Sequence, residues 1–176
     1  WTKLMRLRGL TALISVYDVC QENDTVYAVY SESEEMTLRA YLLSNGAGFI
    51  TWEQARILFM PLLSTVATLH TSGIVHCGID PSSLIFSSDG KLKLTDFCTR
   101  HVKTVYGELE ADIADGYAPP EVYTENGETG PWTDIYSFTA VLFRALVGSI
   151  PAEIVESYSH SHSFQSRRMS VMAARR

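Results

Sequence analysis

Residues 76–96, near the middle of the chain, constrain the fold most because they contain two short strands joined by a turn. The first strand, around Leu84–Phe86, is apolar, and the second, residues 91–94, alternates Lys with Leu. Asp89 and Gly90 lie between the strands, and this dipeptide is typical of a tight hairpin turn. Polar residues precede the first strand and follow the second. The pattern therefore predicts a hairpin that brings polar groups from two neighbouring strand ends together.

Turn residues and hydrophobic periodicity predict the other elements of the chain. In chain order they are a short helix within residues 1–10, strands at 13–19 and 25–30, and helices at 37–43, 51–71 and 132–147. Residues 99–115 show no period and many polar side chains, which predicts a long loop. No internal repeat is present in the sequence.

The helix expected after residue 50 has the clearest start signal. Thr51 is followed three residues later by Gln54, which is the pattern of a capping box. Apolar residues then recur at mixed three- and four-residue spacing and predict a largely buried helix: Ile57, Leu58, Leu62, Val66 and Leu69. Pro61 lies inside this helix and is expected to weaken or kink one turn.

Composition limits the class of protein. With 176 residues, 46% of them hydrophobic, the chain suits one domain, or most of one, with a buried core. A formal net charge of −6 argues against a nucleic-acid partner. Cys20, Cys77 and Cys98 are an odd number without paired metal spacing, so we expect reduced thiols.

The apolar runs of the chain are shorter than the roughly 18 residues that a membrane-spanning helix needs. We therefore expect no membrane insertion by this segment. The sequence opens without the pattern of a signal peptide. These features favour a cytoplasmic location, either for the protein itself or for the cytoplasmic part of a larger membrane-anchored protein.

The chain contains a series of short motifs, among them His76-Cys77-Gly78 and Asp96-Phe97-Cys98. Their order resembles that of protein kinases, especially bacterial serine/threonine kinases of the eukaryotic type. His76-Cys77-Gly78 resembles the His-Arg-Asp of the catalytic loop, and Asp96-Phe97-Cys98 resembles Asp-Phe-Gly. Three further matches are to the last strand before the hinge, the Ala-Pro-Glu motif and the start of a buried helix: Tyr27–Tyr30, Ala118–Glu121 and Trp132–Ser137. Thr37–Leu42 is similar to the helix that follows the hinge.

The resemblance implies an α+β, protein-kinase-like fold, mainly the helical C-lobe with the last strands of the N-lobe. We expect a partial domain at 1–155, with an N-lobe and hinge remnant at 1–35 and the C-lobe at 36–155. Residues 156–176 would form a Ser/His/Arg-rich tail. The N-terminal strands and the last C-lobe helices are expected to be missing, so that a swapped segment or a partner in a homo-oligomer would cover the gaps.

Four positions depart from the catalytic pattern of the family. Gly78 occupies the position of the catalytic Asp, and Cys77 that of the preceding Arg. Asp80 replaces the Lys that contacts phosphate, and Ser83 replaces the Asn that binds the second metal ion. Asp96 alone keeps its identity as a candidate metal and cofactor ligand.

The resemblance to protein kinases implies structural roles for the remaining motif residues. His76 would pack on Phe97, and a buried Asp134 would accept hydrogen bonds from the backbone of residues 76–78. Glu121 would pair with an Arg, for which Arg167 and Arg168 are candidates. Tyr30 takes the gatekeeper position, at which a bulky side chain would narrow an adenine pocket.

Three functional hypotheses follow. The first is a pseudokinase, a signalling or scaffolding module that binds protein partners without efficient phosphoryl transfer. The second is an active serine/threonine kinase that uses non-standard residues such as Asp80 and Asp96. The third is a switch that binds ATP without turnover. We expect no cofactor, and ATP with Mg²⁺ only if the missing N-lobe elements exist in the protein.

Overall fold

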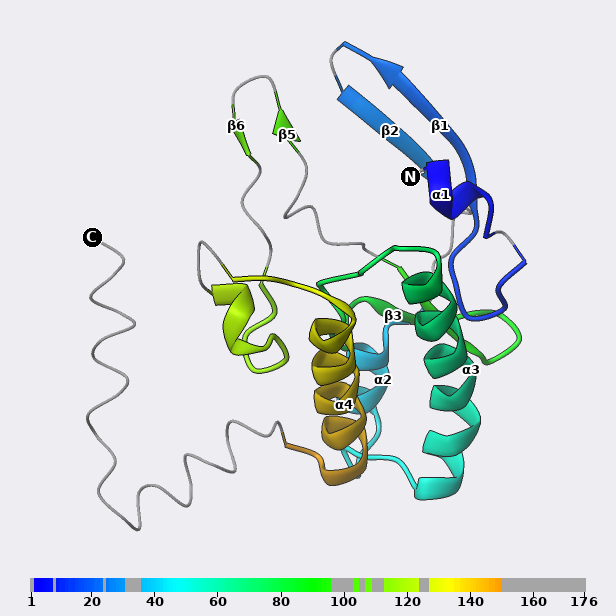
Figure 1. Ribbon diagram of the computed structural model, residues 1–176. Coiled ribbons are helices and arrows are strands. Elements are labelled where there is room, and N and C mark those ends of the chain that lie inside the picture. Colours follow the sequence, from blue (N-terminus) through cyan, green and yellow to red (C-terminus); the bar gives the residue numbers. More distant parts are fainter. Residues whose placement is uncertain are drawn as a thin grey trace, which may run out of the picture.

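A computed structural model describes residues 2–7, 9–23, 25–30, 36–95, 103–104, 107–108, 113–123 and 127–149. Its main body consists of three helices, α2 (Leu38–Ser44), α3 (Trp52–Thr71) and α4 (Pro131–Val147), around a short hairpin (Figure 1). These elements form the helical part of an α+β fold. The predicted helices and strands of this part are all present, with shifted ends.

Local sequence signals fix both ends of α3. The side chain of Thr51 accepts a hydrogen bond from the backbone N–H of Gln54, and the side chain of Gln54 accepts one from the N–H of Thr51. This is the predicted capping box, and it satisfies two N–H groups that a helix start leaves unpaired. At the other end the chain turns at Gly73, whose φ of 69° lies in the left-handed region that glycine adopts readily.

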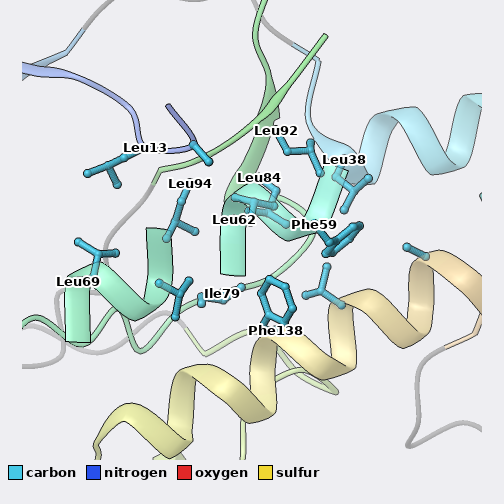
Figure 2. Packing of buried hydrophobic residues seen from close by; sticks show 14 of the residues in the cluster. Leu13, Leu38, Phe59, Leu62, Leu69, Ile79, Leu84, Leu92, Leu94 and Phe138 are labelled. Carbon is cyan, nitrogen blue, oxygen red and sulfur yellow. The ribbon is translucent and has the colours of Figure 1, made fainter. Parts of the chain in front are cut away.

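Helix α4 begins with Gly130 as its N-cap residue and Pro131 in its first turn, where a missing N–H costs nothing. It ends at Gly148, with φ of 85° and an N–H that donates to the carbonyl of Arg144. Helices α3 and α4 pack together through Phe59 and Phe138, whose ring centroids are 5.7 Å apart in an edge-on arrangement (Figure 2).

Strands β3 (Leu84–Phe86) and β4 (Leu92–Leu94) form the predicted antiparallel hairpin, with Leu84 opposite Leu94 and Phe86 opposite Leu92. All three leucines are at most 1% exposed. They belong to one hydrophobic core together with apolar residues of α3 and α4 (Figure 2). The hairpin contacts α2 through β3 and α3 through β4, and residues 76–83 and 95 flank its strands.

The N-terminal region attaches to this hairpin. It comprises α1 (Thr2–Met5) and the antiparallel strands β1 (Val16–Glu22) and β2 (Thr25–Tyr30), which project from the helical body (Figure 1). The N–H of Ile14 donates to the carbonyl of Leu94, and the N–H of Leu94 donates to the carbonyl of Ala12. A two-stranded ribbon is marginal on its own, so these bonds to the core anchor it.

A 3₁₀-helix, η1 (Pro120–Tyr123), precedes α4. Two short strands, β5 (Lys103–Thr104) and β6 (Gly107–Glu108), pair with each other within the segment predicted as a long loop. No described helix is long and apolar enough to cross a membrane. The tail at 156–176 lies outside the described residues.

The prediction that Ile57 is buried was wrong, because its side chain is 67% exposed. The buried side of α3 passes through Phe59, Leu62, Val66 and Leu69 instead. Pro61 does not interrupt the helix, although it cannot donate to the carbonyl of Ile57. That carbonyl lies on the exposed side of α3, where water can satisfy it, which explains why the proline is tolerated.

Candidate functional site

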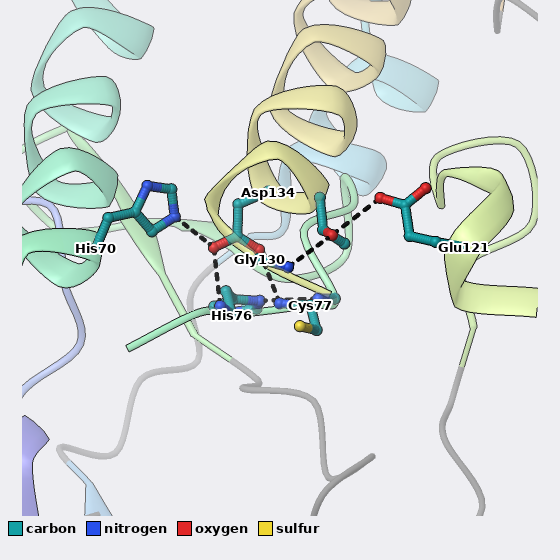
Figure 3. A network of polar contacts seen from close by, with 8 residues as sticks. His70, His76, Cys77, Glu121, Gly130 and Asp134 are labelled. Atoms are coloured by element: carbon teal, nitrogen blue, oxygen red, sulfur yellow. Dashed lines mark hydrogen bonds and ion pairs between the residues drawn. The ribbon is translucent and has the colours of Figure 1, made fainter. Parts of the chain in front are cut away.

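The loop at 76–78 is held by a buried carboxylate in the first turn of α4. Asp134 is 1% exposed and accepts three hydrogen bonds of 2.8 Å, from the N–H groups of His76 and Cys77 and from Nε2 of His70 (Figure 3). Two of these contacts are hydrogen bonds from the backbone of residues 76–78, as the motif predicts. Asp134 also lies in the first turn of α4, where the helix dipole stabilises a negative charge.

These bonds hold Cys77 in an uncommon backbone conformation. Its φ is 60°, in the left-handed region, which costs a residue with a Cβ about 1–2 kcal/mol. The side chain of Cys77 is buried, at 8% exposed. A charge-assisted hydrogen bond from its N–H to Oδ1 of Asp134 offsets that cost. The shape of the loop therefore depends on Asp134.

The imidazole of His76 is 1% exposed and bridges two backbone groups. Its Nε2 lies 2.8 Å from the carbonyl oxygen of Thr95, and its Nδ1 lies 3.2 Å from the N–H of Gly78. A carbonyl needs a donor and an N–H needs an acceptor, so the neutral ring carries its proton on Nε2. His76 thus joins the loop to the end of β4.

Asp80 and Ser83 form a closed turn. Oδ1 of Asp80 accepts hydrogen bonds from the N–H groups of Ser82, at 3.1 Å, and Ser83, at 2.7 Å. The hydroxyl of Ser83 accepts from the N–H of Asp80 and donates to the carbonyl of the same residue. Aspartate commonly closes such turns, since its short side chain reaches the backbone two or three residues on. Both side chains therefore stabilise the loop.

Glu121 interacts with the start of α4. The hydroxyl of Thr133 donates to Oε1 of Glu121 at 3.0 Å and accepts from the N–H of Gly130 at 3.1 Å (Figure 3). Thr133 is fully buried, and Gly130 is buried too. The candidate partners Arg167 and Arg168 lie outside the described residues.

At the end of η1, the hydroxyl of Tyr123 donates to Oδ1 of Asp115 at 3.2 Å. Burial raises the pKa of Tyr123 above its usual value near 10, and the hydrogen bond to the negative Asp115 raises it further. The neutral phenol is therefore favoured in the folded protein. This pair links η1 to the chain that precedes it.

The other motif residues are placed less completely. Tyr30 ends β2 and packs, partly buried, against the hydrophobic core. Asp96, Phe97 and Cys98 lie outside the described residues, so their predicted roles stay predictions. In the part of the chain that the structure describes, no group of three or more His, Cys, Asp or Glu residues is arranged to hold a metal ion.

Two residues of this network were not found from the sequence. His70 closes α3 and reaches Asp134 across a separation of 64 residues, a contact for which no local pattern exists. Thr133 was noted only as part of a motif, although it connects Gly130 with Glu121. A polar residue at a buried helix position is the signal that could have drawn attention to it.

The comparison with known proteins agrees with this geometry. The model of the protein kinase domain family matches residues 2–174, so the chain belongs to the protein kinase family. It is 30% identical to the serine/threonine-protein kinase PrkC of Bacillus subtilis over 148 residues, covering 79% of this chain and 22% of that protein. It is also 30% identical to the CBL-interacting protein kinase 22 of rice (Oryza sativa subsp. japonica), covering 84% of this chain and 35% of that protein.

A third relative, the serine/threonine-protein kinase SIK1 of Mus musculus, is 30% identical and covers 85% of this chain and 19% of its own length. The chain thus spans only about a fifth to a third of the length of these relatives. A bacterial, a plant and an animal kinase match at the same identity, so they do not single out a bacterial source.

Proposed function

We propose that this chain is a pseudokinase-type module, which binds protein partners through a kinase fold without efficient phosphoryl transfer. Phosphoryl transfer needs a carboxylate that orients the attacking hydroxyl, together with charges that hold the phosphates and metal ions. The observation that carries the proposal is Gly78. It follows His76 and Cys77 in the loop held by Asp134, where the family has the catalytic Asp, and it has no side chain.

The hydrogen bonds of Asp80 and Ser83 support the same proposal. The alternative active kinase needs Asp80 as a substitute base. Oδ1 of Asp80 already accepts two backbone N–H groups, and the hydroxyl of Ser83 is engaged as both donor and acceptor. Turning the carboxylate of Asp80 or the hydroxyl of Ser83 away from the turn would break these bonds, so neither side chain can be reoriented toward a phosphate or metal ion without a cost.

The test is transfer of phosphate from radiolabelled ATP to the chain itself and to a generic protein substrate, with Mg²⁺ or Mn²⁺. We expect none above background. Loss of a general base alone typically lowers a rate by a factor of about 10² to 10⁴. Transfer that Asp96→Ala abolishes would establish the active-kinase alternative instead. Asp89→Ala is the matched control, since Asp89 lies in the exposed turn between β3 and β4.

The proposal includes no bound nucleotide for this chain. A ligand that binds only the folded state raises its stability by an amount that grows with ligand concentration. We therefore expect no rise in melting temperature when ATP and Mg²⁺ are added. A rise that scales with ATP concentration would favour the nucleotide-sensing switch. We propose protein partners rather than nucleic acid, because the net charge of −6 disfavours nucleic acid. A cytoplasmic location is part of the same proposal.

A further inference from the structure

A cavity of about 270 Å³ lies between α2, α4 and the loops that precede β3 and η1. Four charged residues from these four segments line it: Arg39, Asp80, Asp115 and Arg144. Leu42 and Tyr117 are among its apolar walls. Helix α2 lies behind α4 in Figure 1, so residues more than 100 positions apart meet at this cavity.

The walls of the cavity are fixed by hydrogen bonds and burial. The N–H of Arg39 donates to the carbonyl of Pro81 at 2.9 Å, which ties α2 to the loop before β3. Nη1 of Arg144 donates to the carbonyl of Gly48 at 2.8 Å, which ties α4 to the chain after α2. Leu42 is 2% exposed. A site whose walls are already in place loses little freedom when it binds a ligand.

The two carboxylates at the cavity already accept hydrogen bonds. Oδ1 of Asp80 receives two backbone N–H groups, from Ser82 and Ser83. Oδ1 of Asp115 receives the hydroxyl of Tyr123. Part of the acceptor capacity of the cavity is therefore used within the protein.

The two guanidinium groups have most of their donor capacity left. A guanidinium carries five N–H donors, and a single hydrogen bond, to Gly48, is made by the side chain of Arg144 within the described ranges. The exposed side chain of Arg39 makes no hydrogen bond or ion pair with the described residues. The cavity thus offers more unpaired hydrogen-bond donors than acceptors. Guanidinium groups pair best with a carboxylate or a phosphate.

We propose that this cavity receives an anionic group of a partner polypeptide, a carboxylate or a phosphate, with Arg39 and Arg144 as its donors. The volume lies just below the roughly 300–1,000 Å³ of small-molecule sites, which suits one side chain. The proposal rests on the function proposed above in one respect, because it names the chemistry of a protein partner. The test of this proposal measures peptide binding without ATP. The peptide can therefore fail to bind although the chain is non-catalytic, and it can bind although the chain transfers phosphate.

The experiment measures retention of degenerate peptide pools by the full chain. The pools share random flanks and differ in one central residue: Glu, phosphoserine, Lys or Ser. We expect the Glu or the phosphoserine pool to be retained about tenfold more than the Ser pool, the scale of a charge-assisted hydrogen bond. The preferred pool of the two tells a carboxylate from a phosphate. Preference for Lys, or equal retention of all four pools, overturns the proposal.

Two variants and one control locate the binding. Arg39→Gln removes an exposed guanidinium and is expected to reduce retention of the preferred pool about tenfold. Asp115→Asn removes a negative charge from the cavity and is expected to increase retention. Arg56→Gln is the matched control, since Arg56 is an exposed arginine of α3 that does not line the cavity. An equal loss in Arg39→Gln and Arg56→Gln would reduce the effect to net charge and overturn the assignment.

Discussion

Replacement of Asp134 by Asn tests whether this carboxylate holds the loop at 76–78. The carboxylate accepts hydrogen bonds from the N–H groups of His76 and Cys77 and from Nε2 of His70. Asparagine keeps one acceptor oxygen and puts an NH₂ donor in place of the other. At least one buried N–H of the loop would then face a donor, and the other bonds would lose their charge assistance.

The magnitude follows from these three bonds. A hydrogen bond to a charged group contributes about 1.5–3 kcal/mol, and a neutral one about 1 kcal/mol. Losing one bond and weakening two therefore costs roughly 3–6 kcal/mol. Relaxation of Cys77 out of its left-handed conformation would return about 1–2 kcal/mol. We expect a net loss of about 2–4 kcal/mol, a large share of the roughly 5–15 kcal/mol that stabilises a domain.

The assay is unfolding in urea, followed by circular dichroism and by tryptophan fluorescence. Asp18→Asn is the matched control, because Asp18 is exposed and accepts a hydrogen bond from the adjacent N–H of Val19. The control should change the free energy of unfolding by less than about 0.5 kcal/mol. A loss below about 1 kcal/mol for Asp134→Asn would refute the reasoning, since three buried charge-assisted bonds cannot contribute so little together.

Two further predictions concern the segment around α4. Thr133→Val keeps the shape of the side chain but leaves the N–H of Gly130 without its acceptor, so it should lower the free energy of unfolding in urea by about 1–3 kcal/mol. Thr139→Val, at an exposed position of the same helix, should lower it by less than about 0.5 kcal/mol. Equal effects of the two changes would contradict the role of Thr133. The pKa of Tyr123 is raised in the folded protein, so the stability that this residue contributes is fully present below pH 10 and is lost as the pH rises through the folded pKa. Asp115→Asn removes one cause of the shift, and the tyrosinate absorbance of Tyr123, obtained as the difference from a Tyr123→Phe chain, should then appear at lower pH; an unchanged titration would contradict the contact.

The features that the sequence predicted well depend on neighbours along the chain. Thr51 and Gln54 form a capping box because the partners are three residues apart, and Asp89-Gly90 marks a turn for the same reason. The error at Ile57 has a different cause: mixed spacing indicates an apolar helix, but it does not tell which side faces the core. The closed turn of Asp80 and Ser83 could have been found, since Asp followed by Pro and Ser favours such turns.

The features that the sequence did not predict join distant positions. The contact between His70 and Asp134 and the meeting of Arg39 with Arg144 at one cavity arise from how α2, α3 and α4 pack. Packing of this kind depends on the shapes of whole helix faces, which a single sequence does not list. The motifs therefore identify the residues of the loop at 76–78, whereas the packing of the helices determines which distant side chains, such as His70, support it.

The backbone bonds between the N-terminal segment and β4 also create a route for mechanical load. Leu94 is bonded on both sides to the segment that leads into β1, and the next residue, Thr95, accepts from the ring of His76. A force applied to the ribbon of β1 and β2 would therefore be transmitted to the loop at 76–78 through Leu94, Thr95 and the imidazole of His76. If an antibody fragment bound to the ribbon slows hydrogen exchange at the amide of Cys77, the ribbon and the loop are mechanically coupled. Unchanged exchange would show that they are not.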